Sequence, residues 1–259
     1  MIKKYDGFIF DLDGTIYLGN KLIPNAEKVI DAIKKKKKKV VFITNKTTGS
    51  VKDYCIFLKE KGLNVTQKEI INSTLITKQY LKEKHSGETF FAIGEQIFID
   101  EIKSIGLKYS RNPKEINIVL ITLDRTLNYK KLEIAAKALD NGARFYAANI
   151  DNTCPVEGGE ILDAGSTISA LEKRTRLKLE KHFGKPSRYM MNEIIKLLNI
   201  PTEKCLLIGD RVETDIVMGN KFGIDTALVS TGVFNHFDGN PQYIPTYKIK
   251  SVYELLTRG

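Results

Sequence analysis

The chain has 259 residues, of which 42% are hydrophobic and 28% are charged, a balance typical of a soluble globular protein of one or two domains. No apolar run reaches the length of a membrane span, and the N-terminus lacks the apolar stretch of a secretory signal, so we expect a cytoplasmic location. The three cysteines are far apart and show no CxxC spacing, which argues against a disulfide framework or a zinc site.

The first predicted elements are a strand at Phe8–Phe10 and a helix that begins near Asn25 and ends in six consecutive lysines at 34–39. These lysines supply much of the net charge of +10. They indicate either a nucleic-acid patch or the solvated C-terminal end of a helix, where cations suit the helix dipole. We favour the helix end, because no aromatic residues interrupt the run and no nucleic-acid motif accompanies it. We therefore expect neither a nucleic-acid nor a membrane partner.

Further apolar, β-branched runs alternate with helical patterns along the chain. Several runs are apolar throughout, which is typical of strands buried on both faces of a parallel sheet. The remaining expected strands are Val40–Thr44, Phe90–Ile93, Ile118–Thr122, Arg144–Ala147, Cys205–Ile208 and Ala227–Ser230. The expected helices include Val51–Lys61, Lys131–Asp140, Ser166–Thr175 and Met190–Leu198. This alternation predicts an α/β fold.

Polar side chains follow three of these strands at the points where the strands end. The groups are Asp11 and Asp13 after the first strand, Thr44 and Asn45 after the second, and Asp210 and Asp215 after the strand at 205–208. Because ligands of open α/β sheets bind beyond the carboxyl ends of the strands, we expect these side chains to converge on one site. Two neighbouring carboxylates repel each other and are costly to bury, so something must use them.

The residue types at this edge suit a phosphate group bound with a metal ion. Three aspartates make a hard anionic site of the kind that Mg²⁺ prefers: Asp11, Asp13 and Asp210. The Thr44 hydroxyl and the Asn45 amide can donate to a phosphate oxygen, and Lys185, between a glycine and a proline, can neutralise phosphate charge. Each feature alone has an ordinary explanation, such as an acidic loop, a helix N-cap or a turn. Their combination predicts a magnesium-dependent phosphate site.

The order of these motifs resembles the haloacid dehalogenase-like superfamily, whose commonest members are Mg²⁺-dependent phosphatases. The four family motifs are DxDGT, a Thr or Ser after a strand, a lysine, and GDxxxTD. They match, in turn, Asp11 to Thr15, then Thr44, then Lys185, then Gly209, Asp210, Thr214 and Asp215. Other stretches resemble the nagD-like, 4-nitrophenylphosphatase-like branch, subfamily IIA: "FITN", "GE" at 94–95, "LDRTLNYKKL" at 123–132, "AANID" at 147–151 and "GKP" at 184–186.

This resemblance implies a Rossmann-like parallel-sheet core with an inserted α/β cap of type IIA, the C2 class. The chain has a separate strand–helix pattern between the second and third motifs, flanked by the polar stretches "INST" and "KLEKHFGKP". We therefore expect the core domain at 1–72 and 183–259 and the cap domain at 73–182. Members of this branch often dimerise through the cap, which makes a homodimer one option for this chain.

The resemblance also implies roles for the aspartates. Asp11 would attack phosphorus and form an aspartyl-phosphate, and Asp13 would act first as general acid and then as general base. Mg²⁺, the implied cofactor, would be bound by the side chains of Asp11 and Asp210 and by the backbone carbonyl of Asp13. Asp215 would orient the metal shell or bind the metal through water.

Other residues would hold the substrate. By the same resemblance, Thr44, Asn45 and Lys185 would bind the phosphoryl oxygens. Asn149 and Asp151 in "AANID" are expected to face the active site from the cap, where they are candidates for substrate contacts. An Asn/Asp turn explains these two residues almost as well.

Several residues depart from the pattern usual in this branch and leave the substrate open: Lys46, Ala148, Ile150, Ser187 and Arg188. The predicted function is hydrolysis of small phosphomonoesters, with nucleoside monophosphates and sugar phosphates as candidates and 4-nitrophenyl phosphate as a test substrate. A phosphotransferase or phosphomutase on the same scaffold is one alternative. A binding or regulatory protein that uses the lysine run is another.

Overall fold

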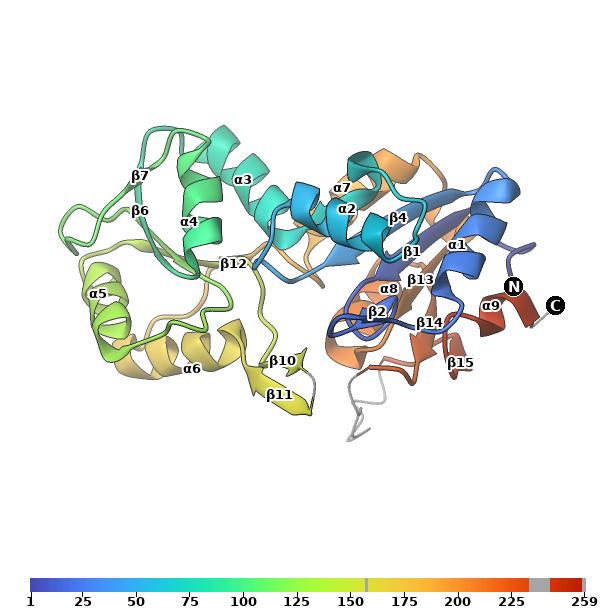
Figure 1. Ribbon diagram of the computed structural model, residues 1–259. Helices are drawn as coiled ribbons and strands as arrows, with labels where there is room; N and C mark the ends of the chain where they lie inside the picture. The colour runs from blue at the N-terminus through green and yellow to red at the C-terminus, as the bar shows by residue number, and fades with distance from the viewer. Residues whose placement is uncertain (157, 233–242, 258–259) are drawn as a thin grey trace.

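Two parallel sheets, each flanked by helices, organise the computed structural model, which describes residues 1–156, 158–232 and 243–257 (Figure 1). The expected core range 183–259 includes residues 233–242 and 258–259, which lie outside the described residues. None of the helices in the described ranges is long and apolar enough to cross a membrane. The α/β class is confirmed.

The first sheet has six strands drawn from both ends of the described chain, and each neighbouring pair is parallel. Its spatial order is β15 (Tyr247–Ile249), β14 (Asp225–Val229), β13 (Cys205–Gly209), β1 (Gly7–Asp11), β4 (Lys39–Thr44) and β5 (Ile70–Asn72). This arrangement is the Rossmann-like core expected from the sequence. Because the strands are parallel, β1, β4 and β13 end at the same edge.

The second sheet is also parallel and lies in the middle of the chain. Its order is β12 (Lys181–His182), β9 (Arg144–Ala147), β8 (Ile118–Ile121), β6 (Thr89–Ile93) and β7 (Lys108–Tyr109). Two antiparallel hairpins complete the strands: β2 (Tyr17–Leu18) with β3 (Lys21–Leu22), and β10 (Thr153–Val156) with β11 (Gly159–Leu162). The β10–β11 hairpin lies between the two units in Figure 1.

Helices cover both faces of both sheets. They are α1 (Ala26–Lys35), α2 (Val51–Glu60), α3 (Ser73–Lys84), α4 (Gln96–Lys103), α5 (Tyr129–Asp140), α6 (Ala164–Thr175), α7 (Arg188–Leu198), α8 (Val217–Lys221) and α9 (Glu254–Thr257). Successive residues of β1 point to opposite faces of the sheet. Phe8 and Phe10 pack in a buried cluster with α1 and α2, whereas Ile9 packs in a second cluster with α7.

That second cluster extends from one sheet to the other. It joins Ile9 and Val41 of the first sheet to Phe90 and Leu120 of the second, with buried side chains of α3, α4 and α7 between them. A third cluster fills the far face of the second sheet beneath α5 and α6. The two units therefore share apolar packing, which fixes the β10–β11 hairpin close to the edge where β1, β4 and β13 end.

The lysine run forms the end of α1 and the turn into β4, in agreement with the helix-end interpretation. Lys34 donates to the Asn64 carbonyl at 2.6 Å and pairs with Glu69. Lys39 donates to the Leu198 carbonyl at 2.6 Å. Lys34 therefore links the end of α1 to residues 64 and 69, and Lys39 links the start of β4 to the end of α7.

Candidate active site

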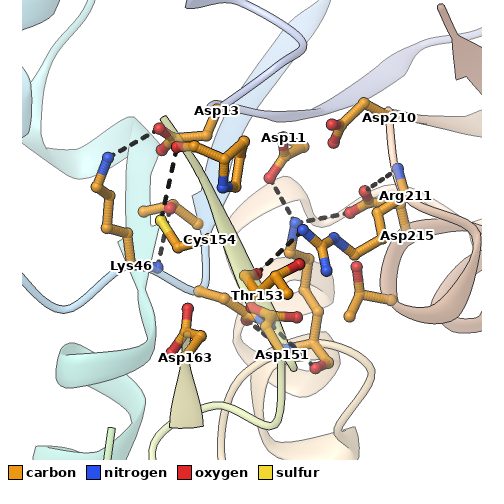
Figure 2. Close-up of a pocket in the computed structure, with 15 residues that line it drawn as sticks. Asp11, Asp13, Lys46, Asp151, Thr153, Cys154, Asp163, Asp210, Arg211 and Asp215 are labelled. Carbon is orange, nitrogen blue, oxygen red and sulfur yellow. Dashed lines mark hydrogen bonds and ion pairs between the residues drawn. The ribbon is translucent and has the colours of Figure 1, made fainter. Parts of the chain in front are cut away.

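The carboxyl ends of β1, β4 and β13 meet at one pocket, and the β10–β11 hairpin of the second unit lines it as well (Figure 2). The pocket is partly open to solvent, and polar and charged side chains make up most of its lining. The core unit contributes all seven residues selected from its sequence: Asp11, Asp13, Thr44, Asn45, Lys185, Asp210 and Asp215. From the second unit, Asp151 lines the pocket and Asn149 does not.

Two glycines allow the carboxylates to approach the backbone. Gly14 has a φ of +80°, and a Cβ there would lie 2.3 Å from Asp210 Oδ2. A Cβ at Gly209 would lie 2.2 Å from the Asp215 carboxyl carbon. The glycines of both motifs are therefore required because side chains occupy the space where a Cβ would stand.

Asp215 reaches the site through an unusual turn. A π-helical segment, Val212–Ile216, follows β13 and leads into α8. Such segments are rare and are frequent at functional sites. Asp215 Oδ2 accepts a hydrogen bond from the Arg211 backbone N–H at 3.1 Å, and the residue is fully buried. The turn thus fixes Asp215 beside Asp210 at the strand end.

Lys185 is the centre of a buried charge cluster. Its Nζ donates to Asp11 Oδ1 and, at 2.7 Å, to Asp215 Oδ1. Burial would lower the pKa of Lys185, but the charges of Asp11 and Asp215 outweigh it and the net shift is upward. Burial raises the pKa of Asp11, and repulsion from Asp215 and Asp210 adds to it while Lys185 opposes it. The pKa of Lys185 is therefore raised by its two carboxylate partners, whereas the pKa of Asp11 is raised chiefly by burial.

The carboxylates of this cluster fit a divalent metal ion. Asp11, Asp210 and Asp215 each offer an oxygen, and these oxygens lie within 4.8 Å of one another. Asp11 Oδ2 is buried and has no hydrogen-bond partner in the described part of the chain. With Lys185 included, the ionised cluster carries a net charge of −2, which a hard divalent cation such as Mg²⁺ would balance through oxygen ligands.

The Asp13 carboxylate lies outside this cluster. Its Oδ1 accepts a hydrogen bond from Lys46 Nζ at 2.9 Å, and its Oδ2 accepts one from the Tyr17 hydroxyl at 2.7 Å. Burial would lower the pKa of Lys46, but the charge of Asp13 outweighs it and the net shift is upward. In the sequence, Lys46 stands out only as a departure from the family pattern. Its place directly after Asn45 was the available signal for a role in the site.

Thr44 and Asn45 are buried at the end of β4 but are used differently. Thr44 Oγ1 accepts a hydrogen bond from the Lys46 backbone N–H at 3.1 Å, and no residue in the described ranges accepts the hydroxyl proton, which leaves it available to a ligand. Both ends of the Asn45 amide are occupied: Oδ1 accepts from Lys185 N at 2.7 Å, and Nδ2 donates to Asp151 Oδ2 at 2.9 Å. The Asn45 side chain therefore connects the two units beside the pocket.

The second unit contributes a group of polar residues, and one of them, Asp163, is not among the site residues expected from the sequence. Asn149, almost fully buried, donates to Asp163 Oδ1 at 3.0 Å and approaches Asp151 Oδ2 at 3.4 Å. Asp163 lines the pocket, and Arg211 donates from its guanidinium to the Thr153 carbonyl at 3.1 Å. Cys154 also lines the pocket, but burial raises the pKa of its thiol to about 12, so it is protonated at neutral pH.

Asp163 gives a pH-dependent prediction for stability. Burial, followed by repulsion from Asp151, raises its pKa to about 6 from 3.8, the value we take for the unfolded chain. Stability from this group is fully present below about pH 4 and is lost as the pH rises through 6. Asp163→Asn cannot ionise, so the variant should gain stability over wild type, reaching about 2–3 kcal/mol at pH 8. Urea unfolding between pH 4.5 and 8 measures this, and a difference that does not change with pH would contradict it.

The fold and the site together define a capped α/β hydrolase with a carboxylate–lysine centre. The family model described as haloacid dehalogenase-like hydrolase matches residues 8–108, and a related model described as HAD-hydrolase-like matches residues 182–255. The sugar-phosphatase AraL of Bacillus subtilis is 32% identical over 96% of this chain and 91% of its own.

Solved structures agree with this assignment. A 4-nitrophenylphosphatase from Thermotoga maritima matches with a TM-score of 0.89 and 29% identity, over 99% of this chain and 98% of its own. A glycerol phosphate phosphatase from Mycobacterium tuberculosis, solved in complex with magnesium, matches with a TM-score of 0.86 and 27% identity, over 98% and 77%. The chain belongs to the haloacid dehalogenase-like hydrolases and is a phosphatase of their nagD-like, subfamily IIA branch.

Proposed function

We propose that this phosphatase hydrolyses small phosphomonoesters, sugar and polyol phosphates among them, with Mg²⁺ and through an aspartyl-phosphate on Asp11. The observation that carries the proposal is the separation of the acidic groups. Asp11 lies in a buried cluster with Lys185 and two further carboxylates, whereas Asp13 lies apart in its own hydrogen bonds. The names of the relatives, a sugar phosphatase and a glycerol phosphate phosphatase, support this substrate class.

In the first step, an Asp11 carboxylate oxygen attacks phosphorus while the bond from phosphorus to the leaving oxygen breaks. The Asp13 carboxyl enters this step protonated on Oδ2, whose neighbour is the neutral Tyr17 hydroxyl, and it gives that proton to the leaving oxygen, so the product leaves as an alcohol. In the second step, water attacks phosphorus and gives a proton back to Asp13. The bond to Asp11 then breaks and inorganic phosphate leaves. Lys46 and Tyr17, which hold the two oxygens of Asp13, keep this carboxyl in one orientation.

The remaining polar groups hold the phosphoryl group. The Lys185 ammonium lies against Asp11 and would neutralise phosphoryl charge, and the Thr44 proton is placed to donate to a phosphoryl oxygen. Asn45 acts by fixing Lys185 and Asp151. Mg²⁺, held by Asp11, Asp210 and the Asp13 carbonyl with Asp215 close by, would supply further charge stabilisation when bound.

We also propose that residues 1–72 and 183–259 act as the core and 73–182 as a cap that restricts substrate size. The two contacts that join the units at the pocket, Asn45 with Asp151 and Arg211 with the Thr153 carbonyl, support this division. A cap in this position excludes bulk water from the reacting group. It would also keep large phosphoproteins out.

The proposed function is tested by phosphate release from 4-nitrophenyl phosphate and a panel of sugar, polyol and nucleoside phosphates, with Mg²⁺ and with EDTA. We expect release with Mg²⁺ and a near-complete loss in EDTA that Mg²⁺ restores, because the carboxylate cluster is unbalanced without a cation. Activity unchanged by EDTA would contradict the metal assignment. Release of the leaving alcohol that requires an added alcohol acceptor, with no matching release of inorganic phosphate, would favour the phosphotransferase alternative.

A further inference from the structure

One carboxylate in the pocket has no part in the reaction described above. Asp163 follows β11 and precedes α6, and it is 7% exposed. It lines the same pocket as Asp11 and Asp13 but stands on the side formed by the second unit (Figure 2). Resting on the proposed function, we propose that Asp163 determines specificity by accepting hydrogen bonds from hydroxyl groups of the leaving alcohol, so that the enzyme prefers esters of polyhydroxylated alcohols.

The two oxygens of Asp163 are in different situations. Oδ1 accepts from Asn149 Nδ2 at 3.0 Å and from the Ala164 backbone N–H at 2.5 Å. No residue in the described ranges donates a hydrogen bond to Oδ2. The first oxygen is therefore used to fix the side chain, and the second is left for a ligand at the pocket.

Helix capping does not account for this arrangement. An aspartate at an N-cap usually accepts from the second or third backbone N–H of the helix, whereas Asp163 accepts from the first, at Ala164, and from Asn149. An asparagine would accept both hydrogen bonds equally well and could not ionise. The carboxylate lowers stability at neutral pH, as its raised pKa shows. A residue that costs stability in a pocket is expected to serve ligand binding.

A second acceptor lies on the same side. Asp151 Oδ2 is held by Asn45 at 2.9 Å, but Asp151 Oδ1 is buried without a hydrogen-bond partner among the described residues. Two cations that line the pocket make their hydrogen bonds with other groups, Lys46 with Asp13 and Arg211 with the Thr153 carbonyl, although the charge of Arg211 lowers the pKa of Asp163 to some extent. This side of the pocket thus offers acceptors that need donors.

The chemistry of the leaving group follows from these acceptors. A carboxylate oxygen can only accept, so an alkyl group leaves it unpaired and an anionic group is repelled. A hydroxyl donates to it, and a hydrogen bond to a charged group is stronger than one between neutral groups. Sites built to bind a hydroxyl reject the analogue that lacks it. Esters of polyols and sugars meet this requirement, whereas simple alkyl esters do not.

The test compares matched substrates in wild type and Asp163→Asn. Glycerol phosphate is paired with propyl phosphate, and sorbitol 6-phosphate with hexyl phosphate, so that each pair differs only in hydroxyl groups. We expect wild type to prefer the polyol member in kcat/KM and Asp163→Asn to lose roughly 10-fold or more of that preference, chiefly through KM. Asparagine retains the two hydrogen bonds of Oδ1 but presents a donor in place of the second acceptor.

Controls separate this inference from a structural role and from the proposed function. Asp140→Asn, an exposed residue of α5 paired with Arg174, should leave the preference unchanged. An equal loss on both members of a pair, or a preference that Asp163→Asn retains, would overturn the inference while the phosphatase assignment stands. Failure of wild type to release phosphate from any member, or from 4-nitrophenyl phosphate with Mg²⁺, would instead overturn the proposed function.

Discussion

Replacing Asp11 by asparagine is expected to lower kcat by at least about 10³-fold on every substrate, because the amide cannot attack phosphorus. The same change should raise stability in EDTA, since it removes one of three buried carboxylates that repel each other. Loss of activity together with a higher unfolding midpoint would therefore exclude misfolding as the cause. Phosphate release and urea unfolding on the same preparation measure both effects, and activity retained by the variant would place the nucleophile elsewhere.

Asp13→Asn is the matched comparison, because it should discriminate between substrates. A sugar or polyol alkoxide needs a proton to leave, so we expect a loss of about 10²–10⁴-fold there. Nitrophenolate leaves without a proton, so the loss on 4-nitrophenyl phosphate should be clearly smaller. Asp11→Asn should show no such difference. An equal loss for both substrate types in Asp13→Asn would contradict its role as general acid.

The sequence was most informative where strands are buried on both faces. β1, β4, β6, β8 and β13 are found where apolar runs predicted them, with ends that differ by no more than one residue. The two-residue strands β7 and β12 and the β10–β11 hairpin were not predicted. Two-residue strands contain too few residues for a pattern to be recognised, and the hairpin strands, TCPV and GEIL, lack the continuous apolar run that marked the buried strands. Their pairing depends on packing between distant parts of the chain.

The site residues also divide into those that the sequence could locate and those that it could not. Asp11, Thr44 and Asp210 could be located because each stands at the end of a recognisable strand, where the parallel order alone brings them together. Asp163 could not be located in this way. It follows the β10–β11 hairpin, which was not predicted, and in the sequence it looks like an ordinary helix N-cap. Lys46 and Arg211 had only their adjacency to motif residues as a signal.

Replacing Lys185 by methionine is expected to be the most damaging change to the fold of the site. Lys185 and its two partners are almost fully buried, with side-chain exposures of 5%, 6% and 0%. Removing the cation leaves carboxylates uncompensated in a medium of low dielectric, which costs about 3–5 kcal/mol when a buried pair is broken. Activity should also fall by roughly 10²–10³-fold, because a donor to the phosphoryl group is lost.

The metal should partly replace the missing charge. Without Lys185 the cluster has a net charge of −3 when Asp11, Asp210 and Asp215 are all ionised, so it should gain more from a divalent cation than the wild-type cluster does. Urea unfolding with EDTA and with Mg²⁺ should therefore show a larger stabilisation by Mg²⁺ in Lys185→Met than in wild type.

Lys131→Met is the matched control. It breaks another buried pair, with Asp124 at 2.5 Å, and neither residue lines the pocket. That variant should lose stability that Mg²⁺ does not restore. Equal responses to Mg²⁺ in Lys185→Met and wild type would mean that Lys185 and the metal do not share the charge of these carboxylates.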